Sequence, residues 1–131
     1  MASILIIDDD ESFRITLAQL LIASGHAAAT ASDGLEGAVL FRANPADLVL
    51  VDMVMPHSGL MMIRVLRSLY PSLRVIAVSG AGSHRLGYAR DLGAFRTLAK
   101  PFTPEQLAAA IADTLAAVPA PPGACDASNK S

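Results

Sequence analysis

The segment LVLVD at positions 48–52 places four consecutive apolar residues directly before an aspartate. A strand that is apolar at every position is typical of a parallel sheet that is covered on both faces, because neither face then meets water. Parallel strands are joined by crossover connections that are usually helices. Residues 48–51 therefore predict a buried strand of an α/β fold, with Asp52 at the carboxyl end of that strand.

Strand-type and helix-type segments alternate on either side of this strand. The apolar pattern predicts further strands at 3–7, 27–31, 73–78 and 94–98, and helices at 10–24, 33–43, 59–69, 83–92 and 103–117. Five strands alternating with five helices indicate a doubly wound α/β sheet with helices on both faces.

Residues that start or stop helices mark several of these boundaries. Gly25 is expected to end the first helix, and Asp33 is expected to cap the second. Thr103, followed by Pro104 and Gln106, has the pattern of a capping box with proline at the first helical position.

Composition excludes several classes of protein. Of the 131 residues, 53% are hydrophobic and 17% are charged, which predicts one folded domain at 1–118 with a disordered Pro/Ala-rich tail at 119–131. A net charge of −2 gives no excess of positive charge with which to bind nucleic acid or an anionic membrane. No apolar run approaches the ~18 residues of a membrane span, and the lone Cys125 cannot form an internal disulfide. We therefore expect a cytoplasmic protein that contacts neither nucleic acid nor membrane.

Reactive side chains follow four of the five predicted strands. Asp8 and Asp9 follow the first strand, Asp52 the third, Ser79 the fourth and Lys100 the fifth. Because ligands of open parallel sheets bind beyond the carboxyl ends of the strands, we expect these groups at one rim. Three clustered carboxylates repel one another unless a cation compensates them, and Mg²⁺ prefers oxygen ligands. A carboxylate can also be a nucleophile towards phosphorus, with the hydroxyl and the ammonium on the other phosphoryl oxygens.

Some residues near the predicted rim also have a purely structural interpretation. Eight of the ten basic residues are arginine, and the other lysine, Lys130, lies in the predicted tail. We therefore interpret Lys100 as a residue that contacts a phosphoryl group, in preference to a surface charge. Asp10 and Glu11 are interpreted as the start of a helix, where acidic residues are favoured. His57 has no second ligand in view and is expected to face solvent.

Four segments together resemble the receiver domain of two-component response regulators. They are ILIIDDDESFR (4–14), DLVLVDMVMP (47–56), VIAVSGAG (75–82) and KPF (100–102). The resemblance extends from residue 3 to about residue 117. It implies a flavodoxin-like, five-stranded parallel sheet with strand order 2-1-3-4-5 and five helices.

The resemblance also implies a role for each residue at the rim. Asp52 would be the phosphoacceptor, Ser79 the switch hydroxyl and Lys100 the lysine that contacts phosphate, with a cis peptide bond to Pro101. Four groups would bind Mg²⁺: the carboxylates of Asp8, Asp9 and Asp52 and the backbone carbonyl of Val54.

Function and partners follow from the same resemblance. A sensor histidine kinase or a histidine phosphotransfer protein would present phosphohistidine, and Asp52 would accept the phosphoryl group. No effector domain follows residue 117 in this sequence, so we expect output through a downstream protein partner or by relay of the phosphoryl group. The expected switch surface comprises the fourth helix, the fifth strand and the fifth helix, and homodimer formation stays open. Beyond its own phosphorylation and dephosphorylation, we expect no enzymatic activity.

Two departures from the family pattern motivate an alternative function. The segment from Pro56 to Gly59 is one residue shorter than the usual loop, and Thr97 stands where the family often has Tyr or Phe. The alternative is a phosphorylation-independent interaction module on the receiver fold. A flavodoxin-like nucleotide or flavin binder is disfavoured, because carboxylates follow the first strand in place of a Gly-rich or hydroxyl-rich phosphate cradle.

Overall fold

The computed structural model describes residues 2–53, 57–79 and 96–116. Its centre is a five-stranded parallel sheet with the order β2-β1-β3-β4-β5, which confirms the predicted strand order. The strands are β1 (Ser3–Ile7), β2 (Ala27–Ala31), β3 (Leu48–Asp52), β4 (Arg74–Ser79) and β5 (Arg96–Ala99). The helices within these ranges are α1 (Glu11–Ala23), α2 (Gly34–Ala43), α3 (His57–Leu69) and α5 (Pro104–Ala116). The helix predicted at 83–92 and the tail at 119–131 lie outside the described residues.

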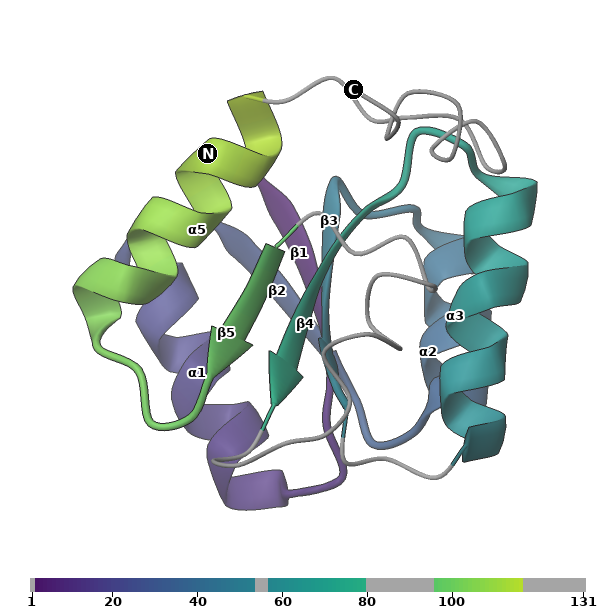
Figure 1. Ribbon diagram of the computed structural model, residues 1–131, viewed down its shortest axis with the longest axis horizontal. Coiled ribbons are helices and arrows are strands. Elements are labelled where there is room, and N and C mark those ends of the chain that lie inside the picture. The colour runs from purple at the N-terminus through teal and green to yellow at the C-terminus, as the bar shows by residue number, and fades with distance from the viewer. Residues whose placement is uncertain (1, 54–56, 80–95, 117–131) are drawn as a thin grey trace, which may run out of the picture.

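Of the helices in the described residues, two cover each face of the sheet. In Figure 1, α1 and α5 lie on one side of the strands, and α2 and α3 lie on the other. Alternate residues of β1 enter the two resulting cores: Ile4 and Ile6 pack with α1 and α5, whereas Leu5 and Ile7 pack with α2 and α3. The same alternation holds along β3. The predicted burial of strand 48–51 on both faces is confirmed.

The helix boundaries follow the predicted capping residues. The Asp33 carboxylate accepts a hydrogen bond from the Glu36 N–H at 2.8 Å. The Thr103 hydroxyl accepts one from the Gln106 N–H at 3.0 Å, and the Gln106 side chain accepts one from the Thr103 N–H at 2.9 Å, which completes the capping box. Gly25 follows the end of α1 with a φ of 94°, a conformation that favours glycine.

One helix begins earlier than predicted. We expected α3 to start near Gly59, but it starts at His57, so Gly59 lies in the first turn. The first N–H groups of a helix have no intrahelical partner, and a glycine therefore disturbs the helix less there than in its middle.

Within the described residues, no helix combines the length and apolar character needed to cross a bilayer.

Helix α2 packs closely against β1 at a glycine. A Cβ atom at position 37 would lie 2.5 Å from Ile7 Cδ1 and 2.9 Å from Ile7 Cγ1. Both distances are shorter than van der Waals contact, and Ile7 is fully buried. Gly37 thus sets the distance between α2 and the strand that ends at Asp8.

We expect Gly37→Ala to destabilise the protein, although alanine is the better helix former. The gain in helix propensity is about 0.5–1 kcal/mol, whereas overpacking of a core costs about 1–3 kcal/mol. Urea denaturation should therefore show a free energy of unfolding that is lower by about 1 kcal/mol. Ile7→Val removes the atom that clashes most, so the loss caused by Gly37→Ala should shrink in that background. An equal loss in both backgrounds would contradict this explanation.

Candidate functional site

The register of the sheet brings two aspartates together. Ile4 pairs with Leu48 and Ile6 pairs with Leu50, so the next positions of the same parity on β1 and β3 are Asp8 and Asp52. Both side chains are almost completely buried, with 2% and 3% of their surface exposed. Two ionisable groups at the ends of adjacent strands are therefore held where water is largely excluded.

A third carboxylate completes an acidic cluster. Carboxylate oxygens of Asp8, Asp9 and Asp52 all lie within 4.8 Å of one another, and Asp9 is exposed. Oxygen donors at this spacing, buried on one side and open to solvent on the other, suit a hard divalent cation that keeps part of its water. Asp8, Asp9 and Asp52 therefore fit the donor set of a Mg²⁺ site. Val54, the fourth predicted ligand, lies outside the described residues.

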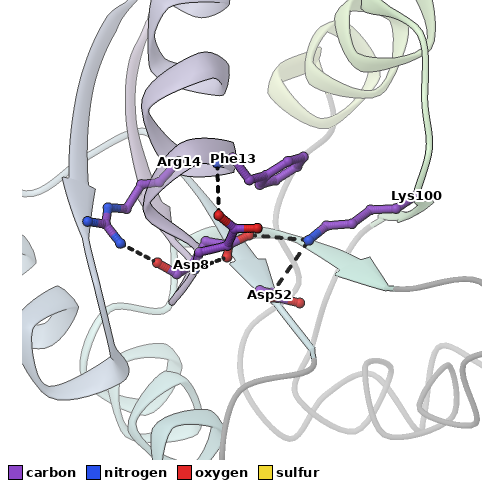
Figure 2. Close-up of polar contacts among 6 residues, drawn as sticks. Asp8, Phe13, Arg14, Asp52 and Lys100 are labelled. Carbon is purple, nitrogen blue, oxygen red and sulfur yellow. Dashed lines mark hydrogen bonds and ion pairs between the residues drawn. The ribbon is translucent and has the colours of Figure 1, made fainter.

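Lys100 brings a positive charge to this cluster from a distant part of the chain. Its Nζ lies 3.5 Å from Asp8 Oδ2 and 3.9 Å from Asp52 Oδ2 (Figure 2). The side chain is 27% exposed, so Lys100 is less buried than either of the two aspartates that it contacts. The peptide bond between Lys100 and Pro101 is cis, as the family resemblance implied.

A backbone N–H and an arginine side chain at the start of α1 hold Asp8. Its Oδ1 accepts a hydrogen bond from the Asp10 N–H at 2.8 Å, and its carbonyl oxygen accepts one from Arg14 Nη1 at 2.8 Å (Figure 2). Burial raises the pKa of the Asp8 carboxyl, and the nearby charge of Asp52 raises it further. The Asp10 N–H and the Lys100 ammonium act in the opposite direction, but the pKa remains above its ordinary value.

The other predicted rim residues occupy the expected backbone positions. Ser79 is the last residue of β4 and pairs with Ala99, which directly precedes Lys100; the Ser79 side chain is not among the described groups. Thr97 lies on β5, exposed and paired with Ala77. Asp10 caps α1 by accepting a hydrogen bond from the Phe13 N–H at 3.2 Å, and Glu11 is the first residue of α1. The helix-start interpretation of Asp10 and Glu11 is confirmed.

Two residues at the site were not predicted from the sequence. Neither Phe13 nor Arg14 was among the candidate site residues, yet Phe13 contacts Lys100 and Arg14 contacts the Asp8 carbonyl. The sequence indicates these two residues only by their position, because both fall in the first turn of the helix that follows Asp8 and Asp9.

Comparison with known proteins identifies the family. The family model described as the response regulator receiver domain matches residues 4–112. The chain belongs to this family. The receiver domain is 33% identical over 136 residues to NtrC of Azospirillum brasilense, named as a DNA-binding transcriptional regulator, and 36% identical over 108 residues to the response regulator MprA of Mycobacterium sp. (strain KMS). These alignments cover 95% and 81% of the chain but only 28% and 47% of the relatives.

Solved structures of receiver domains have the same fold. A receiver domain protein from Clostridium thermocellum superposes with a TM-score of 0.77 at 35% identity, covering 88% of this chain and 94% of that one. The chemotaxis response regulator CheY4 of Vibrio cholerae superposes with a TM-score of 0.78 at 27% identity, covering 87% of this chain and 98% of that one. The predicted flavodoxin-like receiver fold is thereby confirmed.

The raised pKa of Asp8 predicts that its ionised carboxylate destabilises the metal-free receiver domain. A raised pKa means that the folded protein binds this proton more tightly than the unfolded chain, so the free energy of unfolding falls as the pH rises through the folded-state pKa. At pH 7 without divalent cations, Asp8→Asn should therefore raise the free energy of unfolding by about 1 kcal/mol, or Tm by about 3–5 °C.

Thermal unfolding with and without Mg²⁺ checks this prediction. Mg²⁺ should raise the Tm of the wild type and should raise that of Asp8→Asn much less. Asp10→Asn is the matched control, because asparagine caps a helix as well as aspartate and the residue is exposed. A metal-free Asp8→Asn protein less stable than the wild type would show that the carboxylate is stabilising.

Proposed function

We propose that this receiver domain is the phosphoacceptor of a two-component phosphorelay, with Asp52 as the phosphorylated residue. The observation that supports this most directly is the cluster of Asp8, Asp9 and Asp52, whose carboxylate oxygens lie within 4.8 Å of one another, with the Lys100 ammonium beside Asp8 and Asp52. A buried carboxylate beside two others and a cation has the environment of a nucleophile whose charge is balanced during phosphoryl transfer.

The reaction transfers a phosphoryl group from nitrogen to oxygen. An Asp52 carboxylate oxygen attacks the phosphorus of a phosphohistidine, an O–P bond forms, and the N–P bond breaks. The electron pair of the broken bond leaves with the imidazole, which takes up a proton. Because such a transition state needs positioning and charge neutralisation, the main task of the domain is to hold Asp52 and Lys100 in place.

A divalent cation fits the donor set of Asp8, Asp9 and Asp52. Mg²⁺ held by Asp8, Asp9 and Asp52 would neutralise charge on the incoming phosphoryl oxygens. The residues of the chain then have distinct tasks: Asp8 and Asp9 supply oxygen ligands, Asp52 supplies the nucleophile, and Lys100 supplies a positive charge that needs no metal. Ser79, at the end of β4, is proposed as the switch hydroxyl on the strength of its backbone position.

The proposed partners follow from the reaction. The donor is a sensor histidine kinase or a histidine phosphotransfer protein. Phosphorylation adds negative charge at the rim and biases the surface around β5 and α5 between two states, which a downstream protein partner reads. We propose no turnover of a separate substrate, only phosphorylation and dephosphorylation of Asp52 itself.

Phosphorylation of Asp52 is testable by intact-mass measurement. Incubation with acetyl phosphate and Mg²⁺ should add one phosphoryl group to the wild type, and omission of Mg²⁺ should reduce the yield at least tenfold. Asp52→Asn should give no adduct, because an amide cannot be the nucleophile. Beryllofluoride should shift amide NMR signals near Asp52 in the wild type but not in this variant.

Asp47→Asn is the matched control for that experiment. Asp47 lies just before the opposite end of β3, where its carboxylate accepts a hydrogen bond from the Ser3 N–H at 2.9 Å. This variant should be phosphorylated like the wild type. A wild type that behaves like Asp52→Asn would refute the proposed function. Partner binding unchanged by Asp52→Ala and by removal of Mg²⁺ would instead support the phosphorylation-independent module.

A further inference from the structure

An aromatic ring lies against the Lys100 ammonium. The Nζ of Lys100 is 4.0 Å from the centroid of the Phe13 ring (Figure 2). A cation over the face of an aromatic ring within about 6 Å is attracted by the ring quadrupole, and the attraction strengthens as water is excluded. Lys100 is therefore held from two sides, by the carboxylates of Asp8 and Asp52 and by the ring of Phe13.

The ring is itself fixed in place. Phe13 packs edge-to-face against Phe102, with ring centroids 6.0 Å apart and an interplanar angle of 82°. The Phe13 N–H donates to the Asp10 carboxylate at 3.2 Å, and the Asp10 N–H donates to Asp8 Oδ1 at 2.8 Å. The backbone that orients Asp8 thus also positions the ring that contacts Lys100.

The Lys100 ammonium lies farther from both carboxylates than a close ion pair would place it. An unhindered ion pair between an ammonium and a carboxylate closes to about 2.7–2.9 Å, yet the Lys100 Nζ lies 3.5 Å from Asp8 and 3.9 Å from Asp52. At these longer distances the ammonium still offsets negative charge. It also pairs less tightly with the carboxylate oxygens that the proposed function uses as ligands and as the nucleophile.

We propose that Phe13 is a positioning residue whose ring holds the Lys100 ammonium away from full ion pairing with Asp8 and Asp52. This inference rests on the proposed function, in which the same carboxylates bind Mg²⁺ and accept the phosphoryl group. Without the ring, the ammonium closes onto Asp8 and Asp52 and competes with Mg²⁺ for their oxygens. Phe13 thereby sets the affinity of the site for the cation without touching it.

The first test uses the metal-free protein and needs no phosphodonor. The ring current of Phe13 should move the Lys100 ε-methylene proton signals upfield by NMR. The shift should persist in Phe13→Tyr and disappear in Phe13→Leu. Ordinary ε-methylene shifts in the wild type would overturn the proposal, whatever the outcome of the phosphorylation experiment on Asp52.

The second test measures Mg²⁺ affinity by calorimetry. Phe13→Leu should weaken binding about threefold to tenfold, as expected for the loss of one cation–π contact, whereas Phe13→Tyr should stay within about twofold of the wild type. If the leucine variant does not fold, Phe13→Met retains apolar volume without a ring and should show the same weakening. Wild-type affinity in a folded leucine or methionine variant would overturn the proposal.

Phe41→Leu separates positioning from general loss of packing. Phe41 is a buried aromatic residue on the opposite face of the sheet, where it packs edge-to-face with Tyr70 at 4.8 Å. Its replacement should lower Tm and leave Mg²⁺ affinity and the Lys100 proton shifts unchanged. Equal weakening of Mg²⁺ binding by Phe41→Leu and Phe13→Leu would assign the effect to stability and would overturn the positioning role.

Discussion

Asp8 and Asp52 repel each other from the ends of adjacent strands, in surroundings where only 2% and 3% of their surfaces meet solvent. Burial penalises the charged form of Asp8 and raises the pKa of its carboxyl. Nearby groups offset part of it: the Asp10 N–H donates to Asp8, and the Lys100 ammonium lies 3.5 Å from one carboxylate and 3.9 Å from the other. The negative charge left over is the electrostatic reason for the divalent cation in the proposed function.

The four consecutive acidic residues from Asp8 to Glu11 perform different tasks because they occupy different positions between the end of β1 and the first turn of α1. Asp8 continues the alternation of β1 into the core, whereas Asp9 is exposed and turns a carboxylate oxygen to the same cluster. Asp10 caps the helix, and Glu11 lies in its first turn, where the helix dipole favours negative charge. A single short segment therefore ends a strand, contributes to the acidic cluster and starts the helix that carries Phe13.

Much of the fold was predictable because its signals are local. The apolar run at 48–51 indicated a strand buried on both faces, and the capping residues Asp33 and Thr103 marked helix starts that the structure confirms. The start of α3 was misplaced by two residues, because Gly59 suggested a loop although the first turn of a helix tolerates glycine. The close approach of Gly37 to Ile7 has no local signal, since it depends on how α2 packs against the sheet.

For the site, the sequence alone determined which residues reach the rim: each is placed by the end of a strand, and strand ends follow from short-range apolar patterns. Family resemblance then supplied the roles that we expect of Asp8, Asp9, Asp52, Ser79 and Lys100. Only the tertiary structure decided how Lys100 meets Asp8 from 92 residues away, and that the ring of Phe13 lies 4.0 Å from its ammonium. Such contacts form because α1 and the residues after β5 pack against the same edge of the sheet. No periodicity along the chain predicts that packing.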